Sequence, residues 1–340
     1  MRPSKIKYYI FVAVQLLRKI AFPISLIYGL VVLVRNYLYN IGLFKSRSFD
    51  TPIICIGNLS VGGTGKTPMV EFLISFLKED YKVAVLSRGY KRKSKGFALA
   101  STESTVEELG DEPYQIHSKS PEVIVAVDAN RRNGISILQE KVKPDLILLD
   151  DAFQHRKVKP ICSILLTSFN NLYSDDWYLP TGNLRDSKQE AKRADFIIVT
   201  KCPPSLSENE RQSILKKLKP QSHQKVIFSY LVYDKSPLDA MLNKRFTLVT
   251  GIADSSPLVS FLKAEGLDFE HLRFSDHHFF TEEEIQILKG KEHVLTTEKD
   301  YVRLQGKVSN LSFIGVKHAF LGEGEQDLIK NLNGFMKQRR

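Results

Sequence analysis

Eight residues in the first fifth of the chain combine glycine, lysine and threonine in an order suited to holding phosphate groups. They read Ser60-Val61-Gly62-Gly63-Thr64-Gly65-Lys66-Thr67. Glycines let backbone N–H groups close around a phosphate, the lysine reaches the β- and γ-phosphates, and the threonine hydroxyl can bind Mg²⁺. The sequence therefore predicts that residues 60–67 bind a nucleoside triphosphate.

A strand and a helix are expected on either side of this loop. The apolar run Ile53–Ile56 predicts a strand, and Thr67 and Pro68 open a helix with apolar residues suited to a buried face. Ser60 stands where the usual pattern has glycine, and the glycines at 62 and 63 supply the flexibility instead. A chance glycine-rich turn is the alternative, which the strand and helix context disfavours.

Two carboxylates follow a second apolar strand. Leu146–Leu149 predicts that strand, and Asp150 and Asp151 come directly after it. In phosphate-loop enzymes an acid at a strand end holds magnesium directly or through water. Capping of a loop is the alternative, but with the phosphate loop upstream we expect Asp150, Asp151 and Thr67 to bind Mg²⁺.

Short apolar runs alternate with polar helical stretches along the rest of the chain, which is typical of a parallel sheet flanked by helices. The predicted class is therefore α/β, and we expect an N-terminal helical segment at 1–49, a phosphate-loop domain at 50–240 and a smaller α/β domain at 241–340. Residues 203–239 are rich in Lys, Gln, Ser and Pro, which predicts a surface helix followed by a connection. The other predicted elements are strands Val83–Leu86, Val123–Val127, Ile164–Leu166, Phe196–Val199, Phe246–Thr250 and Val294–Thr297, and helix Ser256–Ala264.

The basic residues are unevenly distributed over the 340 residues. Eight of them precede the first acidic residue, Asp50, and account for most of the net charge of +11. They are interleaved with the apolar runs Tyr8–Leu17 and Ile20–Val34, each shorter than the roughly 18 uninterrupted apolar residues that indicate a spanning helix. This pattern predicts an interfacial anchor on an anionic membrane surface. An uncleaved signal-anchor and an ordinary helix covering the core are the alternatives.

Other classes of function fit less well. Three widely separated cysteines, Cys55, Cys162 and Cys202, predict buried free thiols and no disulfide or zinc site. Nucleic-acid binding is disfavoured because the positive charge gathers in the apolar N-terminal segment. A GTPase switch would need an Asn-Lys-x-Asp element, and its nearest counterpart, residues 200–203, lacks the aspartate. A membrane adaptor without catalysis is also disfavoured, and nothing in the sequence requires an obligate protein partner.

Seven ordered motifs resemble the signature of the tetraacyldisaccharide 4′-kinase family, the lipid A 4′-kinases. The resemblance extends from the N-terminal segment to about Leu304. The motifs occupy residues 57–68 (GNLSVGGTGKTP), 87–90 (SRGY), 110–113 (GDEP), 150–155 (DDAFQH), 179–185 (LPTGNLR), 274–279 (FSDHHF) and 296–300 (TTEKD). The family usually has glycine where this chain has Ala152, and often glutamate at the position of Asp186.

The resemblance implies transfer of the ATP γ-phosphoryl group to the 4′-hydroxyl of a tetraacylated glucosamine disaccharide 1-phosphate. This would take place at the cytoplasmic face of the bacterial inner membrane, with the protein bound peripherally or monotopically. A phosphate-loop fold, a second smaller α/β domain and a membrane-associated N-terminal helix are implied as well.

The resemblance also assigns acid–base residues. Asp111 is the first choice of base, paired with His277, and Glu112 becomes a candidate for contact with Mg²⁺. From composition alone, Asp111 and Glu112 suit the first turn of a helix, and one of the two histidines at 277 and 278 suits an exposed turn.

Three cations are expected to stabilise charge on the transferred phosphoryl group. They are Lys66, Arg131 and Arg185, and arginine suits bidentate contact with phosphate oxygens. Arg131 can equally have no part in the reaction, since either it or its neighbour Arg132 can be a solvated surface charge. Gln154 and His155 either position ATP or acceptor or are structural. The motif at 296–300 either faces the nucleotide or holds domains together.

Overall fold

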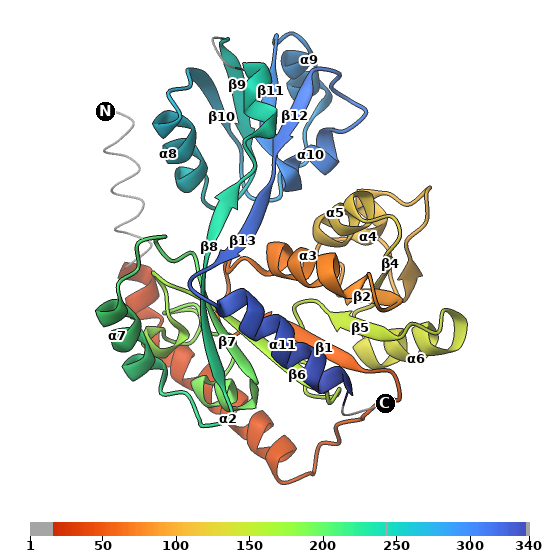
Figure 1. Ribbon diagram of the computed structural model, residues 1–340, viewed down its shortest axis with the longest axis vertical. Coiled ribbons are helices and arrows are strands. Elements are labelled where there is room, and N and C mark those ends of the chain that lie inside the picture. The colour runs from red at the N-terminus through yellow and green to blue at the C-terminus, as the bar shows by residue number, and fades with distance from the viewer. Residues whose placement is uncertain (1–15, 242–243, 338–340) are drawn as a thin grey trace. The chain divides into compact units, whose positions relative to one another are not determined.

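The computed structural model describes residues 16–241 and 244–337 of the chain (Figure 1). The chain forms two compact units, each assembled from separate stretches. The first unit comprises Met1–Lys66, Leu149–Tyr230 and Phe320–Arg340, and the second comprises Thr67–Leu148 and Leu231–Ala319. The division into 1–49, 50–240 and 241–340 stays a prediction, because these units group residues by contact and not by chain order.

A parallel sheet forms the centre of the first unit. Its strands lie in the order β8-β7-β6-β1, and the register pairs Ile54 with Cys162 and Ile164 with Phe196. Strands β1 and β7 are buried along their whole length, as expected for parallel strands covered on both faces. The elements are α2 (Phe22–Asn40), β1 (Ile53–Asn58), β6 (Cys162–Ser168), η1 (Tyr173–Asp175), η2 (Lys188–Arg193), β7 (Phe196–Thr200), α7 (Glu208–Leu218), β8 (Lys225–Tyr233) and α11 (Gly324–Lys337).

Packing around this sheet fixes where the phosphate loop begins. Leu59 and Phe153 belong to one core cluster with side chains of β6, β7 and α7. A Cβ atom on Gly57 would lie 2.7 Å from the Cβ of Phe153, so only glycine permits this approach at the end of β1. Helix α11 lies across the sheet (Figure 1). Its Phe335 ring contacts Phe196 of β7 edge to face.

The second unit contains two groups of strands. Strands β2 and β4 pair in parallel and β3 joins β4 antiparallel, whereas β10-β9-β11-β12 form a separate four-stranded parallel sheet. The elements are α3 (Lys66–Leu77), β2 (Val83–Ser87), β3 (Ala98–Leu99), α4 (Val106–Leu109), α5 (Asp111–Lys119), β4 (Ile124–Val127), α6 (Arg131–Lys141), β5 (Leu146–Leu149), η3 (Ser236–Met241), β9 (Phe246–Thr250), α8 (Ser256–Ala264), β10 (Phe269–Arg273), α9 (Glu282–Lys289), β11 (Val294–Thr297), α10 (Glu298–Leu304), β12 (Leu311–Ile314) and β13 (Val316–Phe320).

Helices cover both faces of the four-stranded sheet (Figure 1). Leu248 and Leu295 pack with Leu258 and Leu262 of α8, while Val249 packs with side chains of α9 and α10 on the other face. The predicted α/β class with a phosphate-loop parallel sheet and a smaller α/β part is confirmed. The predicted strands at 146–149, 246–250 and 294–297 and the helix at 256–264 have the same bounds in the structure.

One segment was interpreted wrongly from the sequence. Residues 203–239 contain the expected surface helix, α7, but also the nine-residue strand β8. Its residues Val226, Ile227 and Phe228 favour a strand, yet the lysine, glutamine and serine around them make the stretch appear to be a connection.

Helix α2 is continuous where the sequence suggested an interrupted apolar run. Pro23 lies in the first turn, where its missing N–H costs no intrahelical hydrogen bond. Among the described helices, this 19-residue helix is the one that is long and apolar enough to cross a membrane, judged by length and composition. Most of the other predicted run, Tyr8–Leu17, lies outside the described residues.

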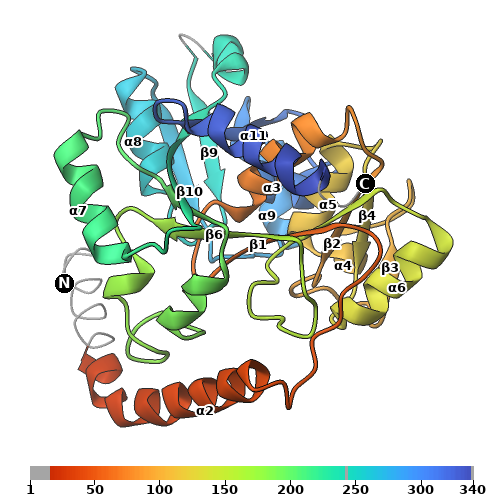
Figure 2. The same ribbon diagram turned by 60° about the horizontal axis from the view of Figure 1, so that its bottom comes forward.

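Figure 2 shows α2 in red along the lower edge of the view. Its buried face is unusual because its residues are small or polar: Ser25, Gly29, Val32 and Asn36. A Cβ atom on Gly29 would lie 2.7 Å from the Tyr178 ring, so the helix approaches its neighbour closely. The large apolar side chains point to solvent instead, including Ile24, Leu26, Ile27, Leu30, Val31, Leu33 and Val34.

Candidate active site

The phosphate loop follows the buried strand β1 and is held by side chains at both its ends. The Asn58 amide donates to the Thr64 hydroxyl at 3.0 Å, and the Thr64 N–H donates to the Gly62 carbonyl at 3.0 Å. Gly62 and Gly65 have φ angles of 116° and 81°, which other residues rarely adopt. The loop therefore takes its curvature from glycines, as the sequence predicts, although the second one is Gly65 and not Gly63.

Ser60, the departure from the usual pattern, is tied to a neighbouring segment. Its hydroxyl donates to Asp176 Oδ2 at 2.9 Å, and the other carboxylate oxygen of Asp176 accepts from the Trp177 and Asn183 N–H groups. The Val61 N–H donates to the Asn183 carbonyl at 2.8 Å. The segment 176–186 thus braces the outer side of the loop.

The same segment carries Arg185 to the phosphate side. The Arg185 N–H donates to the Leu59 carbonyl at 2.9 Å, and its guanidinium forks onto the two carboxylate oxygens of Asp151. That guanidinium also donates to the Asn58 side chain, and Lys66 Nζ lies 3.7 Å from Asp151 Oδ1. Asp151 thus gathers two cations, Lys66 and Arg185, around one carboxylate. We call these residues, with Asn58, the phosphate-side cluster.

Asp151 adopts a backbone conformation that is uncommon for a residue with a side chain. Its φ is 49°, in the left-handed region. The next residue, Ala152, replaces the glycine common in the resembling family, and it is buried with its N–H donating to the Ile56 carbonyl. The left-handed residue is therefore Asp151, and the alanine at 152 does not have to adopt that conformation.

A second cluster forms around Asp111, the first residue of α5. Gly110 caps this helix with a φ of 88°, and the Asp111 side chain makes contacts elsewhere. His277 Nδ1 lies 2.5 Å from Asp111 Oδ2, Arg303 Nε donates to Asp111 Oδ1 at 2.8 Å, and Arg303 Nη2 donates to Asp111 Oδ2. The structure therefore brings the predicted pair, Asp111 and His277, together. We call these residues, with Lys299, the acid–base cluster.

Backbone strain also occurs in this cluster. His277 has a φ of 61°, and its N–H donates to the Gly251 carbonyl at 3.0 Å. Gly251 is itself held by Asp300, whose Oδ2 accepts the Gly251 N–H at 2.8 Å. The other oxygen, Asp300 Oδ1, would lie 2.8 Å from a Cβ atom on Gly251, which is too close for a side chain there. The ring of Tyr90 packs edge to face against His277 at a centroid distance of 5.5 Å.

The electrostatics of Asp111 follow from these contacts. Burial alone would raise its pKa, but hydrogen bonds from His277 and Arg303 and the positive charge of Arg303 lower the pKa to about 2. Asp111 is therefore ionised at neutral pH.

The neighbouring histidine has a different partner. His278 Nε2 lies 2.8 Å from Glu284 Oε2, and Glu284 closes the capping box of α9 with Thr281. The structure thus places His277 on Asp111 and His278 at a helix start.

The family model described as LpxK, tetraacyldisaccharide-1-P 4′-kinase, matches residues 17–335. The chain belongs to this family. A relative named tetraacyldisaccharide 4′-kinase from Flavobacterium johnsoniae is 49% identical over 338 residues, which cover 95% of this chain and 98% of the relative. One of the same name from Bacteroides thetaiotaomicron is 46% identical over 316 residues, covering 85% and 83%. LpxK from Aquifex aeolicus, solved in complex with ATP, is similar with a TM-score of 0.78 and 32% identity, covering 94% of this chain and 99% of that one.

The other residues expected in a tetraacyldisaccharide-1-P 4′-kinase lie near the ends of elements. Thr67 is in the first turn of α3, and Asp150 is buried directly after β5. Arg131 begins α6, is 3% exposed and donates to the Asp128 carbonyl at 2.8 Å. Glu112 follows Asp111 and lies 3.4 Å from Lys299 Nζ. Their roles in this kinase family member remain predictions.

Within residues 16–241 and 244–337, no three or more His, Cys, Asp or Glu side chains group closely enough to hold a metal ion.

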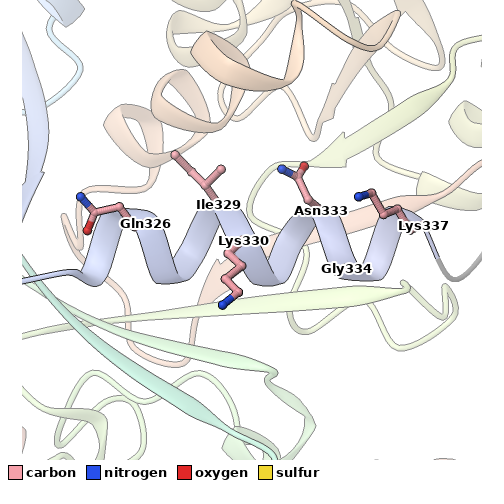
Figure 3. Close-up of a pocket in the computed structure, with 6 residues that line it drawn as sticks. All are labelled: Gln326, Ile329, Lys330, Asn333, Gly334 and Lys337. Carbon is pink, nitrogen blue, oxygen red and sulfur yellow. The ribbon is translucent and has the colours of Figure 1, made fainter.

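A surface hollow along α11 is unrelated to the kinase chemistry (Figure 3). It is lined by Gln326, Ile329, Lys330, Asn333, Gly334 and Lys337, none of which is among the predicted site residues. Lys330 points away from Ile329 and Asn333, so the polar groups do not converge on one point.

Sequence reasoning assigned no site role to four residues that contact the phosphate loop or the Asp111–His277 pair. Asn58 and Asp176 hold the phosphate loop, and Lys299 and Arg303 contact the Asp111–His277 pair. The motif at 296–300 could have pointed to Lys299 and, through it, to Arg303, because Arg303 lies about one helical turn after Lys299 and Asp300 on α10.

Proposed function

We propose that this protein transfers the γ-phosphoryl group of ATP to the 4′-hydroxyl of a tetraacylated glucosamine disaccharide 1-phosphate. The observation that carries the proposal is the Asp111–His277 pair, found intact in a chain that belongs to this kinase family and also has a phosphate loop. A triphosphate site alone would fit many classes of enzyme. A carboxylate–imidazole pair can in addition orient an acceptor hydroxyl and accept its proton.

On the phosphate side, Lys66 and Arg185 are the groups that neutralise charge. Both already lie on the Asp151 carboxylate, which is 33% exposed, so phosphate oxygens can compete for the same cations. Backbone N–H groups of residues 60–67 and the N-terminus of α3 complete an anion site. These residues hold and orient ATP for in-line attack.

Magnesium is the expected companion of ATP. The oxygen ligands available are the Thr67 hydroxyl and the carboxylates of Asp150 and Asp151, with Glu112 as a further candidate, and such hard ligands match the preference of Mg²⁺. Asp151 already pairs with two cations, Lys66 and Arg185, which supports its inclusion among the Mg²⁺ ligands. When bound, the ion would neutralise charge on the β- and γ-phosphates.

On the acceptor side, Asp111 orients the hydroxyl and receives its proton. The two carboxylate oxygens differ, because Oδ2 takes donors from both His277 and Arg303 while Oδ1 takes one from Arg303. Among the contacts of the described residues, Oδ1 therefore retains the lone pair better placed for a hydroxyl proton.

Helix α2 supports docking on a membrane. Its polar face is bonded to the segment that carries Arg185, through Ser25 to Thr181 at 2.8 Å, Tyr28 to the Arg185 carbonyl at 3.0 Å, and Asn36 to Asp186 at 2.8 Å. The outward apolar stripe then suits acyl chains, and the basic N-terminal charge suits an anionic lipid surface. We infer attachment at the cytoplasmic face of the inner membrane, where ATP is present.

The activity is tested with γ-labelled ATP and two acceptors in mixed micelles. One is the tetraacylated disaccharide 1-phosphate, and the other is the same lipid already phosphorylated at the 4′ position. We expect label on the first lipid only, with ATP preferred over GTP. Equal labelling of both lipids, or GTP hydrolysis without lipid labelling, would refute the proposal.

The membrane inference is tested separately by sedimentation with anionic vesicles. Leu26, Leu30 and Val34 lie along one exposed stripe of α2, and changing all three to aspartate should release the protein from vesicles. A matched change of three exposed residues on α7, Glu208, Gln212 and Lys216 to alanine, serves as the control. Unaltered sedimentation of the α2 variant would contradict membrane docking through this helix.

A further inference from the structure

Helix α10 supplies two cations to the Asp111–His277 pair. Lys299 and Arg303 are four residues apart, so their side chains emerge on the same side of the helix. Arg303 contacts Asp111 and Lys299 contacts His277, which places one cation at each end of the pair.

The Arg303 guanidinium is fixed from several directions. Its side chain is 2% exposed, and Nη1 donates to the His278 carbonyl at 3.2 Å and to Asp300 Oδ1 at 3.3 Å. Asp300 is fully buried and is itself fixed by the Gly251 N–H and the Thr297 hydroxyl. Because Nη1 is held by these two acceptors, the guanidinium is oriented so that Nε and Nη2 face Asp111.

Lys299 determines where the imidazole proton lies. Lys299 Nζ is 3.0 Å from His277 Nε2, and an ammonium group has donors but no acceptor. Nε2 must therefore carry a lone pair, and in the neutral ring the hydrogen sits on Nδ1, facing Asp111 Oδ2. Arg303 Nη2 lies 3.2 Å from Nδ1. With the hydrogen on Nδ1, the two nitrogens do not bond to each other, and both donate to Asp111 Oδ2.

Other charged and titratable groups around the pair come from several elements. Asp276 Oδ2 lies 3.8 Å from His277 Nε2, Glu112 lies beside Lys299, and Tyr90 packs on the imidazole. Asp300 lies behind Arg303. Among the contacts of residues 16–241 and 244–337, none of these four side chains bonds to the Asp111 oxygens, which accept from His277 and Arg303.

We propose that Arg303 and Lys299 are positioning residues of the kinase reaction: Arg303 holds the Asp111 carboxylate in a fixed orientation, and Lys299 keeps the His277 proton on Nδ1. The proposal rests on the proposed function. Phosphoryl transfer depends mainly on orientation and electrostatics, so a carboxylate that is fixed in place suits an acceptor hydroxyl better than a mobile one.

The first test is the steady-state kinetics of lipid phosphorylation by Arg303→Met. Loss of the fork should leave the Asp111 carboxylate free to turn away from the acceptor hydroxyl. We expect kcat to fall by about 10- to 100-fold, with the KM for ATP within about twofold of wild type. A wild-type kcat would overturn the role of Arg303.

Two further variants make this test decisive. Arg303→Lys keeps the charge but loses the fork, so its kcat should lie between those of wild type and Arg303→Met while the KM for ATP is unchanged. If Arg303→Met does not fold, as judged by thermal melting, a wild-type kcat for Arg303→Lys overturns the proposal. Lys307→Met, which removes an exposed cation just beyond α10, should match wild type throughout.

The second test observes the imidazole directly. In protein labelled with ¹⁵N-histidine, the His277 signal, assigned by its loss in His277→Gln, should show the Nδ1–H tautomer. Lys299→Met should allow the Nε2–H form to appear, and an unchanged tautomer would overturn the role of Lys299. This readout needs no lipid substrate. Failure of wild type to phosphorylate lipid would therefore count against the proposed function and not against this tautomer.

Discussion

The phosphate-side and acid–base clusters are built from the same parts and differ in exposure. Each has a central carboxylate forked by an arginine, Asp151 with Arg185 and Asp111 with Arg303. Each also contains a residue other than glycine with a left-handed backbone. Yet the Asp151 side chain is 33% exposed and the Asp111 side chain only 6%.

That difference explains how one motif can serve two purposes. A partly exposed ion pair costs less to break than a buried one, so Lys66 and Arg185 can exchange Asp151 for phosphate oxygens more easily than Arg303 can leave Asp111. A buried carboxylate that loses its arginine would be left as an uncompensated charge, so the Asp111–Arg303 pair is expected to persist. The first cluster is thus adapted to exchange partners and the second to keep them.

The largest effect is expected from removing the lysine of the exposed cluster. Lys66→Ala should lower kcat/KM for lipid phosphorylation by about 10³-fold, because a preorganised cation on the transferring phosphate is lost. ATP affinity, measured by equilibrium dialysis, should weaken as well. Lys78→Ala is the control, since Lys78 forms only a surface pair with Glu122. A Lys66→Ala enzyme within tenfold of wild type would break the assignment.

Asp111→Asn probes the buried cluster with almost no change of shape. We expect kcat to fall by about 10²- to 10⁴-fold, the range for a positioned acid–base group, while ATP affinity stays at the wild-type value. Steady-state kinetics with varied ATP separates the two quantities. Full activity of this variant would require another base, and Asp151 would be the next candidate.

Arg185→Lys sharpens the contrast in a smaller step. A lysine keeps the charge but cannot fork onto Asp151 and Asn58 as the guanidinium does. We expect a loss of about 10-fold in kcat/KM, visible as a raised KM for ATP or a lower kcat in initial-rate assays. Because this cluster is exposed, thermal stability should barely change, and a large drop in Tm would contradict that view.

The last effect concerns the stability of the fold in acid. The pKa of Asp111 is lowered to about 2 from an ordinary value of 3.8, so its ionised form stabilises the fold above pH 4, and this contribution is lost as pH falls from about 4 to 2. The loss should amount to about 2 kcal/mol. Urea unfolding across this range should show a shallower pH dependence for Asp111→Asn. Identical slopes for both proteins would argue against the depressed pKa.

The two clusters also differ in how far the sequence could predict them. The phosphate loop is local, so residues 60–67 and their strand and helix follow from glycine positions and apolar runs. The acid–base cluster joins α5, the turn at His277 and α10, which lie far apart in the chain, and a single sequence contains no record of such contacts. Only the family resemblance paired Asp111 with His277, and neither source identified Arg303.

Local patterns failed where a side chain acts through a distant partner. Ser60 looked like an irregular loop residue, but its hydroxyl is held by Asp176, more than 100 positions away. Ser25 lies within the apolar run Ile20–Val34 and Asn36 just beyond it, yet both belong to the buried face of α2, against residues 181 and 186. Hydrophobic periodicity cannot reveal a helix whose polar side faces the protein.

One measurement tests the division of roles between the clusters most directly: single-turnover phosphorylation of labelled disaccharide 1-phosphate lipid by Asp111→Asn, with ATP binding measured in the same preparation. We predict that the variant binds ATP with the wild-type Kd and transfers phosphate at least about 100-fold more slowly than wild type. Transfer at the wild-type rate, or loss of ATP binding in step with transfer, would contradict the account.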